Sequence, residues 1–255
     1  MARFKAVRHE DRLTLVEHLD ELRTRIIVSV SVLVVAMSLC FWQNERLLDI
    51  ANKPLPDDFV PTTFGVAEPF TTTLTISAYF AILLSLPIIL YQAYAFVLPA
   101  FTERERRFAF PLLLLVPVLF IAGAVFAYFV VMPPAIKFLL NFNDDQFTIQ
   151  VRAREYYSFF ATMLIALGVM FQIPLGTVLI TRMGLLTPDQ LAENRRFAIL
   201  GIAVLAALLP SIDPVTLILE MVPLILLYEL SILLARAFAP ARAGPMQSEP
   251  STQER

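Results

Sequence analysis

Four long runs of this chain contain no Asp, Glu, Lys or Arg, and they restrict the possible folds more than any other feature. The runs cover residues 26–42, 70–98, 108–136 and 156–181. A helix needs about 20 largely apolar residues to cross the hydrocarbon core of a bilayer. Only 16% of all residues are charged, whereas soluble domains carry about 25%. We therefore predict an all-α, polytopic membrane protein.

Two shorter runs follow, and they decide the predicted number of crossings. Residues 197–212 are uncharged, and residues 214–235 contain Glu220 and Glu229. Together they indicate a helical hairpin, so we expect six transmembrane helices, the last two of them short. Fifteen of the 20 Lys and Arg residues fall on the side that holds both termini, which predicts cytoplasmic termini. A re-entrant hairpin would leave the C-terminus on that same side, so charge does not separate these two topologies.

The chain divides into three predicted segments. Residues 1–25 form a cytoplasmic segment with an amphipathic helix, residues 26–235 the six-span domain, and residues 236–255 a disordered cytoplasmic tail. Thr14 and Glu17 have the spacing of a capping box at the start of the amphipathic helix. Its apolar stripe has helical spacing and consists of Leu15, Leu19, Leu22 and Ile26.

A second capping box follows the fourth run. Thr187 and Gln190 have the required spacing, and Pro188 occupies the first helical position between them. This pattern predicts that the fifth helix begins in the cytosol, before its apolar part. Near the end of the chain, Asp213 precedes Pro214, a pairing that favours a helix N-cap.

The distribution of reactive side chains argues against an enzyme. The single cysteine, Cys40, lies in an apolar run, and the only histidines are His9 and His18. A serine–histidine dyad at membrane depth would need a histidine after His18, and an aspartyl dyad would need an aspartate within an apolar run. We expect no catalytic residues, no metal site and no cofactor.

A proton-coupled secondary transporter is the alternative function class, suggested by Asp213, Glu220 and Glu229. No internal repeat is visible in the sequence, and the spans contain no cation or histidine to pair with an acid. Both observations disfavour a transporter.

Several short motifs lie along the chain, each at the start or end of an apolar run or within one. The segment before the first run reads HLDELRTR (residues 18–25), and EPF (68–70) stands at the mouth of the second. LPAF (98–101) with ERR (105–107), FQIP (171–174) and LYE (227–229) follow. The first motif resembles the HLxELRxR signature of the TatC family, and the others are similar to further motifs of that family. The resemblance covers roughly residues 14–236.

The resemblance implies a function. It indicates a core subunit of the twin-arginine translocase in the cell inner membrane, which binds twin-arginine signal peptides and exports folded proteins using the proton motive force. The implied partners are those peptides, TatA- and TatB-type single-span proteins, other copies of the chain and membrane lipid, with no nucleic acid. By motif position, the acids that contact the peptide's arginine pair are Glu21 and Glu105. The rest of the predicted peptide site consists of their motif neighbours His18, Leu22, Arg23 and Arg106.

The positions of Glu21 and Glu105 support this role in peptide binding, because both lie within one or two helical turns of an apolar run. A carboxylate there could pair bidentately with a guanidinium. The competing interpretation is that Glu21 only pairs with Arg25 along its own helix, and that Glu105 belongs to a solvated charge run, residues 103–107.

A second group of residues is predicted to bind partners or to be polar within the membrane. It comprises Glu68, Pro69, Phe70, Gln172, Asp213 and Glu229. The sixteen residues 197–212 would span only about 24 Å as a helix, against a hydrocarbon core near 30 Å. Either the local bilayer thins or a partner covers the mismatch, and we hypothesise that a single-span partner binds the surface of the last three helices, around Gln172. An interhelical hydrogen bond that only fixes packing remains the alternative role for Gln172. The family often has a glutamine where this chain has Leu217, so that residue's role does not transfer.

Overall fold

The computed structural model describes residues 15–97, 103–147, 149–182, 184–209 and 213–238, and within them leaves undescribed the side chains of 15–17, 103–112 and 238. In these ranges every regular element is a helix, so the all-α prediction is confirmed. The capping-box residue Thr14, most of segment 1–25 and most of the tail lie outside the described residues.

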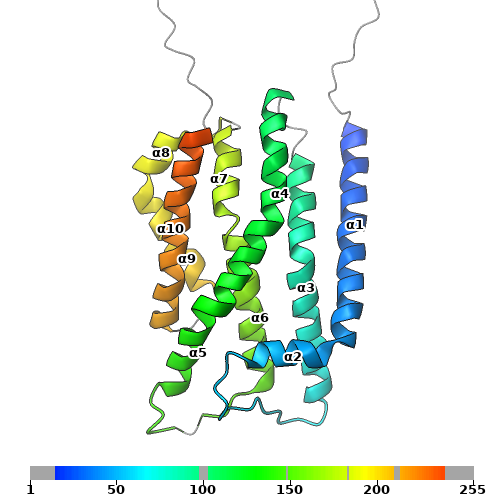
Figure 1. Cartoon of the computed structure of the whole chain (residues 1–255), viewed down its shortest axis with the longest axis vertical. Coiled ribbons are helices and arrows are strands. Elements are labelled where there is room, and N and C mark those ends of the chain that lie inside the picture. The colour runs from blue at the N-terminus through cyan, green and yellow to red at the C-terminus, as the bar shows by residue number, and fades with distance from the viewer. Residues whose placement is uncertain (1–14, 98–102, 148, 183, 210–212, 239–255) are drawn as a thin grey trace, which may run out of the picture.

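The first helices build one wall and one end of the molecule. Helix α1 (Leu15–Trp42) continues without a break from the predicted amphipathic part into the first span. Helix α2 (Asn44–Asn52) then turns across the lower end of the bundle, and α3 (Glu68–Val97) runs back beside α1 (Figure 1). The start of α1 and the end of α3 therefore lie at the same end of the molecule.

The third long run forms a single rod with a defect in the middle. It consists of α4 (Glu103–Phe126), a π-helical turn η2 (Ala127–Val131) and α5 (Met132–Asn141). Pro133 and Pro134 follow the turn and lack the N–H groups that would bond to carbonyls four residues earlier. The N–H of Met132 bonds instead to the carbonyl of Ala127, five residues back. The prolines thus account for the π-helical turn.

The fourth run is two helices, α6 (Ala153–Met170) and α7 (Ile173–Arg182). Phe171 and Gln172 lie in the break between them. Because Pro174 cannot donate a hydrogen bond to the carbonyl of Met170, an uninterrupted helix would lose that bond here.

The last part of the chain corrects one prediction. The capping box at Thr187 and Gln190 is present, with both hydrogen bonds formed, but it starts the short helix α8 (Pro188–Glu193). The fifth apolar run begins a separate helix, α9 (Arg195–Ala207), because the chain turns at Asn194. Helix α10 (Pro214–Phe238) completes the chain and packs against α7 and α9.

Five helical stretches among the described residues are long and apolar enough to cross a membrane. They are His18–Trp42, Glu68–Val97, Leu113–Asn141, Ala153–Arg182 and Pro214–Ala237. Helix α9 has 13 residues, which amount to about 20 Å. The predicted short fifth span corresponds to this helix, and the count of six crossings stays a prediction.

Two glycines allow α4 and α6 to cross closely. A Cβ atom added at Gly123 would lie 2.7 Å from the carbonyl oxygen of Leu167 and 2.9 Å from the Cα of Gly168. A Cβ atom at Gly168 would lie 2.7 Å from the ring of Phe120. Small residues at such a crossing let backbones approach, which is how helices gain packing contacts in lipid.

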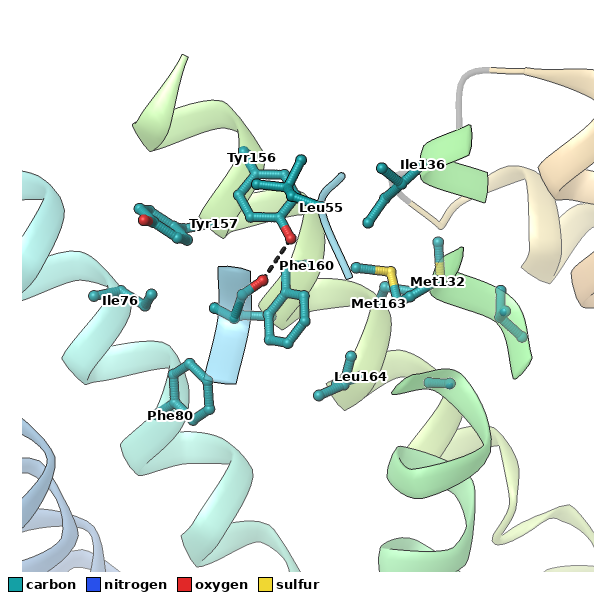
Figure 2. Close-up of a cluster of buried hydrophobic side chains, with 14 of the residues drawn as sticks. Leu55, Ile76, Phe80, Met132, Ile136, Tyr156, Tyr157, Phe160, Met163 and Leu164 are labelled. Carbon is teal, nitrogen blue, oxygen red and sulfur yellow. Dashed lines mark hydrogen bonds between the residues drawn. The ribbon is translucent and has the colours of Figure 1, made fainter. Parts of the chain in front are cut away.

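The main buried cluster lies toward the end of the molecule that carries α2 (Figure 2). Ile76, Phe80, Met132, Phe160 and Met163 belong to it, and each is nearly or fully buried. The cluster also buries Tyr156, whose hydroxyl donates to the carbonyl of Ala51 at the end of α2. This bond satisfies the one polar atom that the tyrosine carries into an apolar environment. It also ties α2 to α6.

Candidate functional site

Glu21 of the predicted peptide site is held by a neighbour on its own helix. The Nε of Arg25 donates to Oε1 of Glu21 at 3.0 Å, and Nη2 of Arg25 contacts the same oxygen. About a quarter of each side chain is exposed. The helical pair between Glu21 and Arg25 expected under the competing interpretation is therefore present.

The same arginine also reaches a second helix. Nη1 of Arg25 donates to Oε1 of Gln92 at 2.9 Å, and Nη2 donates to the carbonyl of Ala95 at 3.2 Å. Both acceptors lie in the last turns of α3. The pair thus joins the start of α1 to the end of α3, which a purely local helical pair would not do.

His18 completes this arrangement. Its ring stacks on the ring of Phe96 with 4.2 Å between centroids, and its Nδ1 lies 3.9 Å from Oε2 of Glu21. Leu22 is half-buried and Arg23 is exposed. Four predicted site residues therefore lie together where α1 begins, and Oε2 of Glu21 is the oxygen that Arg25 leaves available.

Glu105 and Arg106 lie in the first turn of α4, which begins at Glu103. That turn is at the same end of the molecule as the start of α1 and the end of α3 (Figure 1). Their side chains belong to the part of α4 that the structure does not describe. The backbone places both predicted acids at one end, and the contacts of Glu105 stay outside the described features.

Gln172 is buried, with 6% of its surface exposed. Its amide Nε2 donates to the carbonyl of Val116 on α4 at 3.1 Å, whereas its Oε1 is buried without a hydrogen-bond partner among the described atoms. The side chain therefore points into the interface between α4 and the α6–α7 break. This geometry fits the packing role and puts the amide below the surface proposed for a partner.

Asp213 caps the last helix, as its position before Pro214 indicates. Its Oδ1 accepts from the N–H of Thr216 at 2.7 Å, which is the N-cap hydrogen bond. The helix it starts also carries Glu220, whose side chain is completely buried.

Glu229 forms an ion pair near the other end of α10. Nε and Nη2 of Arg195 donate to its two carboxylate oxygens at 2.8 and 3.0 Å. The adjacent Tyr228 donates to the carbonyl of Leu191 on α8 at 2.9 Å. These contacts fix α8 and the start of α9 against α10, and they give Glu229 a cationic partner that charge counting did not assign to it.

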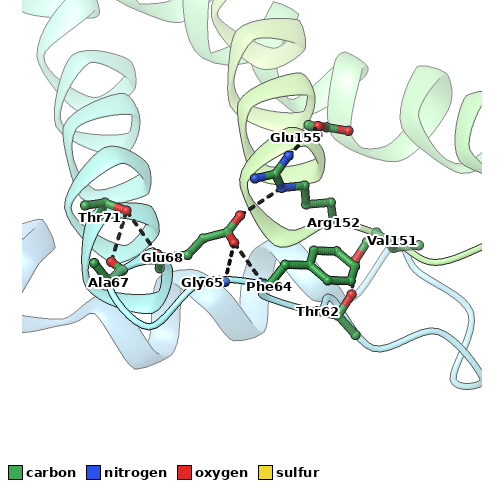
Figure 3. A network of polar contacts seen from close by, with 9 residues as sticks. All are labelled: Thr62, Phe64, Gly65, Ala67, Glu68, Thr71, Val151, Arg152 and Glu155. Atoms are coloured by element: carbon green, nitrogen blue, oxygen red, sulfur yellow. Dashed lines mark hydrogen bonds and ion pairs between the residues drawn. The ribbon is translucent and has the colours of Figure 1, made fainter.

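Glu68 is the centre of a polar network at the opposite end of the molecule (Figure 3). Its Oε2 accepts from the N–H groups of Phe64 at 2.8 Å and Gly65 at 3.1 Å, and its Oε1 accepts from Nε of Arg152 at 2.9 Å. Beside this pair, the backbones of Thr62 and Val151 are hydrogen-bonded. Glu68 therefore fastens the loop after α2 to the start of α6.

Pro69 and Phe70 follow Glu68 in the first turn of α3, and both are exposed. Glu68, Pro69 and Phe70 belong to the second predicted group, and the structure places them far from the predicted peptide-site residues of the first group. His18, Glu21 and the first turn of α4 lie at one end, and the Glu68 network lies at the other.

The predicted groups omitted four residues that take part in these contacts in the structure: Arg25, Gln92, Arg152 and Arg195. The spacing of Arg25 to Glu21 predicts their pair, but not the contacts of Arg25 with α3. The other three contact acids or arginines that are distant in sequence, and no local pattern signals such pairs.

Known proteins resemble the chain over most of its length. The family model of the Sec-independent protein translocase protein (TatC) matches residues 17–223. The TatC protein of Desulforapulum autotrophicum is 35% identical over 91% of this chain and 87% of its own length. That of Escherichia coli O6:H1 is 33% identical over 90% of each. A crystal structure of the twin-arginine translocase receptor TatC in DDM superimposes with a TM-score of 0.76 and 34% identity, covering 86% of this chain and 99% of that one.

Proposed function

Because the chain belongs to the TatC family of Sec-independent protein translocase proteins, we propose that it receives twin-arginine signal peptides and passes folded proteins across the inner membrane. The family assignment makes it a multi-pass core subunit of the translocase. The proposal adds the peptide as ligand, the proton gradient as energy source, and an orientation with both termini in the cytoplasm. The excess of Lys and Arg on the terminal side supports that orientation.

The arrangement around Glu21 is the observation that carries the proposal. A carboxylate that is a quarter exposed is held where Arg25 joins α1 to α3, and its second oxygen, which Arg25 does not bond, lies 3.9 Å from Nδ1 of His18. The backbone of Glu105 lies at the same end of the molecule. Two carboxylates at one end suit a ligand with two adjacent guanidinium groups, since each can accept a charge-assisted hydrogen bond.

The proposed site favours arginine over lysine for a geometric reason. A guanidinium presents parallel donors that match a carboxylate, whereas an ammonium offers a compact, strongly hydrated charge. Each charge-assisted contact contributes about 1.5 to 3 kcal/mol before water reduces it at an exposed site. Two such contacts explain why an arginine pair would be selected.

An export assay tests the proposal. A folded fluorescent reporter with a twin-arginine signal peptide should leave the cytoplasm only in cells that carry this gene, and a reporter with a twin-lysine signal should stay inside. Export that continues after deletion of the gene, with no other copy of the family present, would contradict the proposal.

A single-span partner is proposed to bind the exposed face of α9. Phe197, Leu200 and Val204 are 53–62% exposed and form an apolar stripe on this short helix. A photo-crosslinker at Leu200 should capture a TatA- or TatB-type protein in native membranes. The same crosslinker at Val34 on α1, which is 59% exposed, is the control, and capture only from Val34 would contradict this surface.

The transporter alternative is not favoured. The pairing of Glu229 with Arg195 gives that acid a structural role, and Asp213 serves as a helix cap. Solute uptake by the purified chain alone would be the observation in its favour.

A further inference from the structure

A groove runs between the middle of the third span and the last helix, away from both ends already described. Phe126 and Val130 line it on one side. The other side is the lower half of α10, through Val215, Ile218, Leu219, Val222, Pro223 and Leu226. All of these side chains are apolar, so the groove offers a ligand dispersion contacts and burial of hydrocarbon, and no side-chain hydrogen bonds.

A second hollow continues along the same rod toward the end that carries α2. Pro134, Lys137, Phe138, Asn141, Phe142 and Asn143 line it. Phe126, Val130, Pro134 and Phe138 follow one another at intervals of four residues, about one helical turn each, along the rod. Helix α5 extends beyond the lower end of α10 (Figure 1). The apolar groove and a hollow with a cation and two amides therefore follow one another along the same rod.

The dimensions match one leaflet of a bilayer. Phe126 and Lys137 are eleven residues apart, or about 16 Å along a helix. Half of a hydrocarbon core of about 30 Å is about 15 Å. Phe138 and Phe142, whose rings lie 5.6 Å apart, line the same hollow as Lys137.

The charges around the hollow specify the head group. Lys137 is exposed and can pair with a phosphate, and the amides of Asn141 and Asn143 can donate to its oxygens. Asp144 and Asp145 follow directly and are also exposed. Their carboxylates repel a head group with net negative charge and attract one that carries an ammonium beyond the phosphate.

The geometry points to a binding site for one zwitterionic glycerophospholipid of the phosphatidylethanolamine type. One acyl chain lies in the apolar groove between η2 and α10, the phosphate contacts Lys137, and the ammonium faces Asp144 and Asp145. A bound lipid chain would fill the groove beside the π-helical turn and hold α10 against the third span. The site is independent of the peptide-recognition end.

Native mass spectrometry of the delipidated full chain, titrated with phosphatidylethanolamine, tests the site. The wild type should retain one lipid under activation that strips the rest. Lys137→Gln should lower its affinity about threefold to tenfold, because one ion pair at a water-accessible position is lost, and Lys137→Arg should restore most of it. Ile218→Trp should lower it as well by filling the groove.

Two matched controls separate this site from general lipid contact. Lys53→Gln removes an exposed lysine at the same end of the molecule, and Leu114→Trp enlarges an exposed apolar side chain outside the groove. Neither should change lipid retention. Equal losses in Lys137→Gln and Lys53→Gln, or in Ile218→Trp and Leu114→Trp, would overturn the site.

Two further outcomes also decide the proposal. Phosphatidylglycerol binding as tightly as phosphatidylethanolamine would overturn the head-group assignment. A photo-crosslinker at Ile218 in native membranes should yield a lipid adduct, and a protein adduct there would show that a partner helix occupies the groove instead.

Discussion

Arg25 holds Glu21 from one helical turn away and ties it to the end of α3. One guanidinium contacts the carboxylate of Glu21, the amide oxygen of Gln92 and the carbonyl of Ala95. The proposed peptide site is therefore built on a contact between two helices, and the carboxylate does not swing freely in water. Its position should depend on the arginine fork.

Arg25→Lys should weaken binding of a twin-arginine signal peptide about threefold to tenfold, although the positive charge stays. In Arg25, three separate nitrogens reach Glu21, Gln92 and Ala95, and a lysine, whose three donors share one nitrogen, does not reproduce that spread. The exposed Arg46 of α2, at the opposite end of the molecule, supplies the control, and Arg46→Lys should leave the affinity unchanged. Fluorescence anisotropy with a labelled peptide in nanodiscs measures both. Tighter peptide binding by Arg25→Lys would mean that Arg25 competes with the ligand.

The close crossing of α4 and α6 gives a stability prediction. Gly123→Ala should destabilise the protein by about 1 to 3 kcal/mol, because the new Cβ meets the backbone of α6 and the helices must separate. Gly201→Ala is the matched control, since nothing lies within 4 Å of a Cβ at that helical position. Thermal unfolding in detergent compares the two. Equal unfolding temperatures would contradict the close approach.

Local sequence patterns predicted much of this structure, but they did not predict the contacts between residues far apart in the sequence. The capping box at Thr187, the cap at Asp213 and the pairing of Glu21 with Arg25 all join residues three or four apart. Such contacts follow from helical geometry alone. Glu68 and Arg152 are 84 positions apart, so only the packing of α3 beside α6 reveals their pairing.

Two features of the helices also escaped prediction. The turn at Asn194 divides what appeared to be one helix into α8 and α9, because a good N-cap shows where a helix starts and not how far it continues. The π-helical turn before Pro133 depends on which carbonyls the prolines leave without donors. The pattern of hydrophobic residues predicts neither the turn at Asn194 nor the π-helical turn.

The ion pair of Glu68 and Arg152 should stabilise the contact between the loop after α2 and α6, and the effects of substituting the two residues should not add. Glu68→Gln and Arg152→Gln should each lower the unfolding temperature, and the double substitution should lower it by less than the sum, because either change alone removes the same contact. Glu155 provides the control, because its side chain is 74% exposed and its Oε1 lies 3.4 Å from Nη1 of Arg152. Glu155→Gln should have little effect. Strictly additive changes in unfolding temperature for Glu68→Gln and Arg152→Gln would contradict a stabilising contribution from their ion pair.

The six-span topology can be tested through the connection between α9 and α10. A single cysteine at Ser211, in a Cys40→Ala background, should react with a membrane-impermeant maleimide added outside the cell. The native Cys40 is 2% exposed, so the wild type should remain unlabelled and serves as the control. Labelling of Ser211→Cys from the cytoplasmic face alone would indicate a re-entrant hairpin.

The proposed peptide site makes its sharpest prediction for Glu21 and Glu105 together. Glu21→Ala and Glu105→Ala should each remove one charge-assisted contact and weaken peptide binding, and the double substitution should lose both contacts. Glu103→Ala, in the same charged run as Glu105, is the matched control, because general electrostatics of the loop predicts equal losses at both positions. A specific site predicts a clear excess at Glu105.

Salt provides the independent check on that pair. Since Glu21 is partly exposed, mobile ions should screen its attraction for a guanidinium, with a screening length of about 10 Å at 0.1 M and 3 Å at 1 M. Raising the salt should weaken wild-type binding and reduce the difference between wild type and the double variant. Peptide affinity measured in nanodiscs at the two salt concentrations decides the matter. If the Glu21→Ala, Glu105→Ala variant binds the peptide as the wild type does at low salt, the recognition site lies elsewhere on the molecule, and the family assignment is unaffected.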